Sequence, residues 1–221
     1  EKIIFLNELA WKEKSNLKQF MINFGQNKQS IYLMNSQGVY VKDVRPRIKT
    51  VAQGIFEKEG QVQSSYDAVG ALGDYQFIRN QDMEDFILNI IAKGERLLKA
   101  EGAPSGTMPV VIAGDAGGTM VHEACGHSLE ADIVKKGMSV YGDKIGEKVA
   151  GEKITVIDDG GIIGRYGSGF FDDEGTKTKE NILIEAGVLK GYMTDIISAK
   201  KLNIPLSGNG RREGYHALPI T

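Results

Sequence analysis

Residues 30–41 read Ser30-Ile31-Tyr32-Leu33-Met34-Asn35-Ser36-Gln37-Gly38-Val39-Tyr40-Val41, and this stretch decides the first half of the fold. Two short runs of β-branched and aromatic residues lie on either side of the turn-forming residues 35–38, which is the pattern of a β-hairpin. Gly38 suits the end of the loop because glycine adopts a positive φ without steric cost. The stretch therefore predicts two antiparallel strands.

The same pattern of short strand-type runs continues on both sides of this hairpin, from Leu17 to Tyr75. Further short runs of the strand type occur at residues 20–24, 49–52, 55–57 and 62–66. Turn-forming residues separate these runs at 25–27 and at 59–60. Regularly spaced short strands with turns between them predict an antiparallel meander.

Helices are expected before and after this meander in the sequence. Residues 1–14 have the apolar spacing of a short helix. A second helix is expected to begin at Asn80, whose side chain would cap it, and its apolar positions recur at helical spacing up to Leu98. The sequence thus predicts an α+β fold, with a β-rich portion and one long helix in residues 1–105.

The second half, residues 106–221, is expected to be a separate portion built from strand–helix units and Gly-rich loops. Residues 108–113 predict a buried strand, which leads through a tight turn at residues 114–118 to a helix. Further on, the pattern predicts a helix at residues 129–136, a strand at 153–160, a long Gly-rich loop at 160–175, a hairpin at 181–192 turning near Ala186-Gly187, and a helix ending at Leu202.

The composition narrows the class of protein. The chain has 221 residues, a formal net charge of −2 and a single cysteine. With so small a net charge, no overall electrostatic field favours binding to nucleic acid. No apolar run approaches the ~20 residues of a membrane span. A single cysteine excludes an internal disulfide framework. We therefore expect a cytoplasmic protein with neither membrane nor direct nucleic-acid binding. The absence of an initiator Met or signal pattern suggests that the start is missing.

The candidate chemistry lies in His122-Glu123-Ala124-Cys125-Gly126-His127. Two imidazoles with a carboxylate between them indicate part of a metal site with its general base. On a regular helix, residues five apart point about 140° away from each other, so one ion would not meet both rings. Gly126 predicts a kink or π-bulge that would bring them together. The alternative is that these are ordinary residues at the end of a helix.

Other candidates are weaker. Cys125 or His216 could supply a third ligand, but the sole cysteine is more simply a small residue on the packing face. The acidic groups at 158–159 and 172–174 could bind a metal through oxygen, although turn or cap roles fit them better. Arg211 and Arg212 could hold a substrate carboxylate or carbonyl, with a structural salt bridge as the alternative. The residues alone leave the metal site incomplete.

A family resemblance completes this interpretation. The blocks that carry it are residues 106–111, 122–132, 156–160, 172–176, 189–193 and 208–213. In this order they resemble the TldD branch of the TldD/PmbA (TldE) family, and the resemblance is looser over residues 1–105. It implies a zinc-dependent (Zn2+) peptidase in which His122 and His127 bind the metal and Glu123 is the general base. The substrates it implies are unfolded or extended peptides, and the partner is a metal-free subunit of the TldE/PmbA type.

The resemblance also concerns the third zinc ligand and the alternatives to a peptidase. The family's third zinc ligand resembles a cysteine far towards the C-terminus, so we expect it beyond Thr221 and regard the chain as a central fragment. Older descriptions call family members modulators of DNA gyrase. The alternatives to a peptidase are therefore a non-catalytic, gyrase-associated binding module, or a fragment too incomplete to bind zinc.

Overall fold

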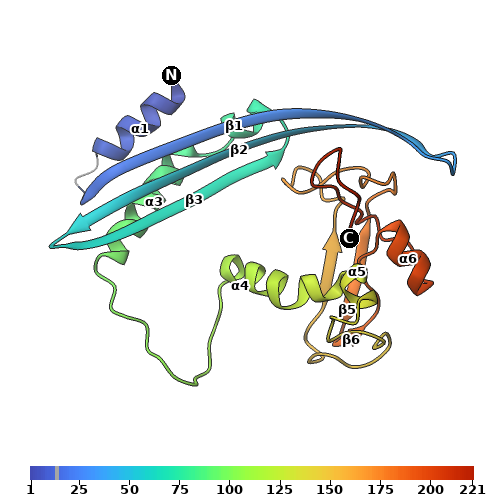
Figure 1. The fold of residues 1–221 in the computed structure, drawn as a ribbon. Coiled ribbons are helices and arrows are strands. Elements are labelled where there is room, and N and C mark those ends of the chain that lie inside the picture. Colours follow the sequence, from blue (N-terminus) through green and yellow to red (C-terminus); the bar gives the residue numbers. More distant parts are fainter. Residues whose placement is uncertain (13–14) are drawn as a thin grey trace. The chain divides into compact units, whose positions relative to one another are not determined.

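The computed structural model describes residues 1–12 and 15–221, and its elements are drawn in Figure 1. It contains two antiparallel sheets with helices, so the predicted α+β class is confirmed. The chain forms two compact units. Unit 1 comprises residues 1–29, 45–107 and 164–167, and unit 2 comprises residues 30–44, 108–163 and 168–221. The domain boundary predicted near residue 105 stays a prediction.

A three-stranded sheet confirms the predicted meander. Its strands are β1 (Leu17–Met34), β2 (Tyr40–Lys58) and β3 (Gln61–Leu72), in the order β1-β2-β3. The predicted hairpin loop is present: the Asn35 side chain accepts hydrogen bonds from the backbone of Gln37 and Val39, and Gly38 has φ +81°. The turn predicted at residues 25–27 is wrong, because these residues continue β1 as one long strand beside β2.

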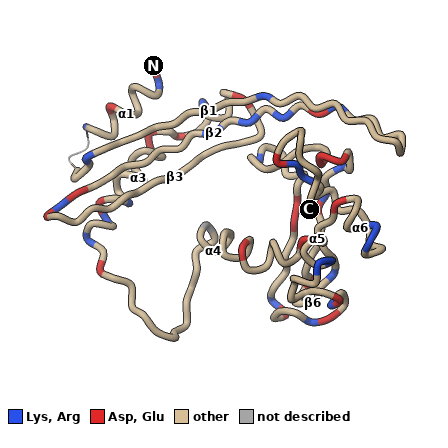
Figure 2. The backbone as a smooth tube through the Cα atoms, viewed as in Figure 1, with Lys and Arg blue, Asp and Glu red and all other residues tan. Residues whose placement is uncertain are grey.

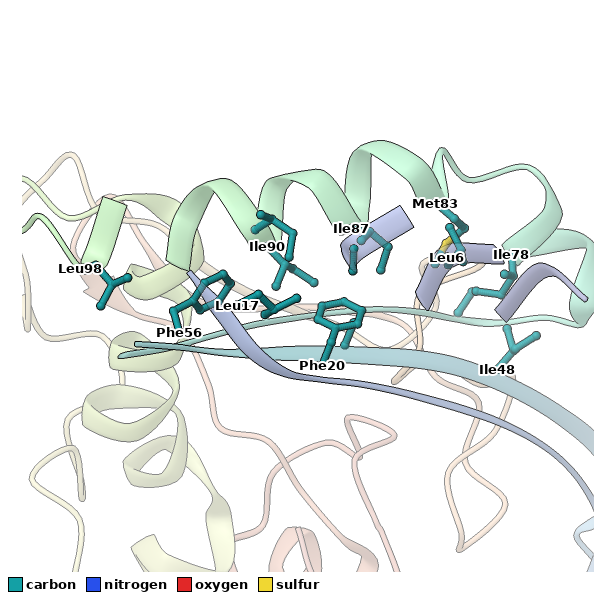
Figure 3. Packing of buried hydrophobic residues seen from close by; sticks show 14 residues of the cluster. Leu6, Leu17, Phe20, Ile48, Phe56, Ile78, Met83, Ile87, Ile90 and Leu98 are labelled. Carbon is teal, nitrogen blue, oxygen red and sulfur yellow. The ribbon is translucent and has the colours of Figure 1, made fainter. Parts of the chain in front are cut away.

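Helices α1 (Lys2–Lys12), α2 (Tyr75–Arg79) and α3 (Met83–Leu97) belong to unit 1. The last two residues of the helix predicted over 1–14 lie outside the described residues. Figure 3 shows apolar side chains of α3, among them Ile87 and Ile90, facing Phe20 and Phe56 of the sheet. The cap predicted at Asn80 is wrong: Asn80 ends α2, and Asp82 caps α3 by accepting from the backbone of Asp85.

Unit 2 contains the motif and a small sheet. Helix α4 (Gly114–Val121) runs into a π-helical turn η1 (His122–Gly126) and a 3-10 turn η2 (His127–Leu129), followed by α5 (Ala131–Lys135). The sheet has strands β4 (Val156–Asp159), β5 (Glu180–Glu185) and β6 (Val188–Leu189) in this order, and α6 (Ile196–Leu202) follows. The hairpin predicted at Ala186-Gly187 is confirmed, and both residues have positive φ.

Two expectations just before the motif are wrong. Residues 108–113 form no strand, and their side chains are exposed, that of Val111 fully. A strand needs a neighbour that satisfies its backbone groups, and within the described part of the chain none pairs with this segment. Residues 114–118 lie in α4 rather than in a tight turn.

Acidic and basic residues are interspersed along both units in Figure 2, in keeping with the small net charge. Among the described residues, no helix combines the length and the apolar character that crossing a membrane requires.

Candidate metal centre

The motif leaves the α-helix at its first histidine. From His122 to Gly126 the backbone forms a π-helical turn, and the N–H of His127 donates to the carbonyl of His122, five residues earlier. The predicted break in the helix is therefore confirmed. The two imidazole rings lie with their centroids 4.5 Å apart and their planes inclined by 71°. The wider turn thus brings together two side chains that a regular helix would separate.

Three potential ligand groups meet at this turn. One donor atom each of His122, Glu123 and His127 lies within 4.8 Å of the others. It is the one such group of three or more His, Cys, Asp or Glu residues among those that the structure describes. Two donor atoms that bind one zinc ion at about 2.0–2.1 Å are at most ~4 Å apart. Modest rotations of these exposed side chains would therefore bring the three donor atoms to binding distance of one ion. Two imidazoles and an adjacent carboxylate fit the chemistry of a zinc site.

A fourth residue contacts one of the two rings. Nδ1 of His127 lies 2.8 Å from Oε1 of Glu130, while its Nε2 lies 3.9 Å from Oε2 of Glu123. An ionised carboxylate only accepts hydrogen bonds, so Nδ1 carries the hydrogen and Nε2 of the neutral ring keeps its lone pair. Sequence reasoning missed Glu130. The signal for it was its position three residues after a proposed ligand, where side chains on a helical turn meet.

Cys125 is not a member of the group of three ligand residues. It is partly buried, packs against the apolar core of unit 2, and accepts a hydrogen bond from the Tyr141 hydroxyl at 3.5 Å. This hydrogen bond, together with burial, raises the pKa of Tyr141 to about 12. The interpretation of Cys125 as a packing residue agrees with this environment.

The remaining candidates have other surroundings. His216 is exposed and stacks edge-on against Tyr215, with ring centroids 5.4 Å apart. Asp172 accepts from the backbone N–H groups of Glu174 and Thr176, so it closes a turn as expected.

Asp158, Arg211 and Arg212 also form hydrogen bonds within unit 2. The carboxylate of Asp158 accepts from the Asn209 amide at 2.8 Å. Arg211 donates to two backbone carbonyls and Arg212 donates to the carbonyl of Ala217. The role of the arginines in substrate binding stays a prediction.

Comparison with known proteins identifies the family. The PmbA/TldA metallopeptidase central domain matches residues 1–100, and the C-terminal domain of the same metallopeptidases matches residues 105–221. The chain belongs to the PmbA/TldD metallopeptidase family. Its TldD resemblance is supported by a metalloprotease TldD homologue of Buchnera aphidicola, 39% identical over 87% of this chain and 41% of that protein.

Two further comparisons concern the metal and the fold. A zinc metalloprotease TldD homologue of Saccharolobus solfataricus is 33% identical over 63% of the chain and 31% of its own length. The crystal structure of TldE from Thermococcus kodakarensis has the same fold, with a TM-score of 0.78 at 22% identity, over 100% of this chain and 49% of that one. The chain spans about half the length of the curated relatives it matches.

Proposed function

We propose that the protein is the zinc-dependent, catalytic subunit of a TldD-type peptidase that hydrolyses peptide bonds in unfolded or extended peptides. The observation that carries the proposal is the π-helical turn, because it brings the donor atoms of His122, Glu123 and His127 within 4.8 Å of one another. A metalloprotease relative supports the reaction type and a zinc metalloprotease relative supports the metal.

Each of these residues has a distinct role. His122 and His127 would hold the zinc ion through imidazole nitrogens, and a cysteine that the family resemblance leads us to expect outside these residues would be the third ligand. Bound zinc would act as a Lewis acid that polarises the scissile carbonyl and acidifies water. Glu123 takes the proton from the attacking water and passes it to the leaving amine. Its side chain is 67% exposed, so water and peptide reach the carboxylate freely.

An extended substrate suits the architecture. The first sheet ends in β1 on one side and β3 on the other, and an extended peptide can add to an edge strand through its main chain. Main-chain pairing leaves sequence preference weak. We propose further that the protein works with a metal-free TldE/PmbA-type subunit, a partner that the family resemblance implies. A cytoplasmic location stays a prediction.

Substitution of Glu123 by Gln in the full-length protein, assembled with its partner, tests the proposal. The amide keeps the size of the side chain but takes up no proton, so we expect peptide cleavage to fall by 100-fold or more, in line with about 10²–10⁴ for a general base. Zinc content measured on the same samples should stay unchanged. Glu152→Gln is the matched control, since this glutamate is 80% exposed and pairs with Lys148.

Two outcomes would contradict this function. Cleavage that survives Glu123→Gln would exclude Glu123 as the base, whereas a zinc-loaded wild-type protein that cleaves no peptide would favour the non-catalytic, gyrase-associated module. A full-length protein that binds no zinc would exclude the metallopeptidase mechanism altogether.

A further inference from the structure

Glu130 has its carboxylate on the ring of a proposed zinc ligand. Oε1 of Glu130 lies 2.8 Å from Nδ1 of His127, within the range of a charge-assisted hydrogen bond. The side chain of Glu130 is 21% exposed, against 51% for His127, so the contact is shielded more on the carboxylate side than on the imidazole side. This partial burial limits the competition from water for the hydrogen bond.

The backbone of Glu130 is held firmly by the core of unit 2. Its neighbours Leu129 and Ala131 are fully buried. Met193 bridges both of them, because its N–H donates to the carbonyl of Leu129 at 3.0 Å and its carbonyl accepts from the N–H of Ala131 at 2.8 Å. The carboxylate therefore extends from a fixed point of the fold, whereas His122 and Glu123 lie on an exposed helical turn.

Glu130 does not use its carboxylate for the helix that it begins. It is the N-cap residue of α5, with extended backbone dihedral angles of φ −77° and ψ 125°, but its side chain makes no capping hydrogen bond. The N-cap residues that accept from the first N–H groups of a helix are usually Ser, Thr, Asp or Asn, whose side chains are shorter than that of glutamate. Here the oxygen is directed to His127 instead, which indicates a role at the imidazole.

We propose that Glu130 is the positioning residue of the metal centre: it holds the His127 ring in the tautomer and orientation that direct Nε2 towards His122 and Glu123. The proposal rests on the proposed function. A carboxylate on the second nitrogen of a metal-binding imidazole fixes the ring and increases its basicity as a ligand. The structure supplies the direction, since Nε2 is the nitrogen that lies 3.9 Å from Glu123.

Metal affinity of the full-length protein is the direct test. Zinc dissociation constants of wild type, Glu130→Ala and Glu130→Gln are measured by competition with a chelator. Loss of an outer hydrogen-bond partner typically costs about 10–100-fold in metal affinity, and we expect this loss for Glu130→Ala. Glu130→Gln should recover part of it, because the amide oxygen still accepts from Nδ1–H.

The cobalt-substituted proteins provide a second readout that does not depend on cleavage. The visible absorption bands of bound Co2+ report ligand geometry, so we expect altered bands for Glu130→Ala and bands close to wild type for Glu130→Gln. Glu152→Ala is the control, and thermal unfolding of the metal-free proteins shows whether each variant folds. If Glu130→Ala does not fold, Glu130→Gln and Glu130→Asp carry the comparison of affinity and spectrum.

The outcomes separate this inference from the function on which it rests. Wild-type affinity and wild-type cobalt bands in Glu130→Ala, or in Glu130→Asp where Ala does not fold, would overturn the positioning role and leave the peptidase proposal standing. Weakened zinc binding in Glu130→Ala, combined with intact cleavage in Glu123→Gln, would support the positioning role and remove Glu123 as the base.

Discussion

The backbone N–H of His127 donates to the carbonyl oxygen of His122, so the two proposed ligands are joined by the hydrogen bond that ends the π-helical turn. In an α-helix the corresponding bond spans four residues, and histidines five apart would diverge by about 140°. The π turn takes up the additional residue, and the ring centroids lie 4.5 Å apart. The five-residue spacing is thus matched by a five-residue hydrogen bond.

Replacing either histidine should abolish stable zinc binding. His122→Ala or His127→Ala leaves one imidazole and the expected cysteine, fewer than the three protein ligands of a catalytic zinc site, so the ion should be lost to a chelator. His216→Ala is the matched control because His216 lies outside the ligand group. Zinc per full-length chain, measured after dialysis against a chelator, checks the prediction. Zinc retained by both variants would place the metal elsewhere.

Gly126→Ala should be tolerated. Gly126 has φ −55° and ψ −57°, which any residue adopts, and an added Cβ would lie 3.8 Å from Nδ1 of His122, an ordinary contact. We expect the free energy of unfolding to change by no more than about 1 kcal/mol, the difference in helix propensity between the two residues. Chemical denaturation and the zinc dissociation constant test this expectation. A large loss of zinc affinity would show that the π turn requires glycine.

Cys125→Ala should leave zinc bound but change the titration of Tyr141. The hydrogen bond to Cys125 is the largest cause that raises the pKa of this hydroxyl to about 12, so its removal should lower the pKa towards 10. Only the folded state has the raised pKa, so the protonated hydroxyl of Tyr141 stabilises the fold. This contribution to the free energy of unfolding is complete below pH ~10 and is lost as the pH rises towards 12. Absorbance titration of the tyrosinate measures the shift, and an unchanged titration curve would contradict the contact.

Two glycines in helices should respond oppositely to alanine. A Cβ at Gly94 in α3 would overlap the buried ring of Phe56, whereas a Cβ at Gly118 in α4 would meet nothing within 4 Å. Overpacking should destabilise Gly94→Ala by about 1–3 kcal/mol. Gly118→Ala should gain up to ~1 kcal/mol from helix propensity. Urea unfolding of the two variants side by side tests the pair, and equal effects would contradict the close packing at Gly94.

Local chemistry allowed several elements to be predicted from the sequence. The loop at residues 35–38 depends on Asn35, whose side chain bonds to the backbone of the loop itself, and on Gly38 with its positive φ. The turn at Ala186-Gly187 is local in the same way. The break after His122 could be expected because Gly126 disfavours a regular helix and the five-residue spacing requires a wider turn. In each case the deciding groups lie within five residues of one another.

Contacts between distant residues decided the rest. Turn formers at 25–27 continue β1 because pairing with β2 outweighs their local preference. Residues 108–113 have strand-forming side chains but no strand partner in the described part of the chain. Glu130 reaches His127 from a backbone that Met193 holds in place from far along the sequence. The sequence by itself determined the turns and the ligand spacing, where the interacting groups are neighbours. Only the tertiary structure decided the length of β1 and the backbone position of Glu130, since both depend on hydrogen bonds between residues far apart in the sequence.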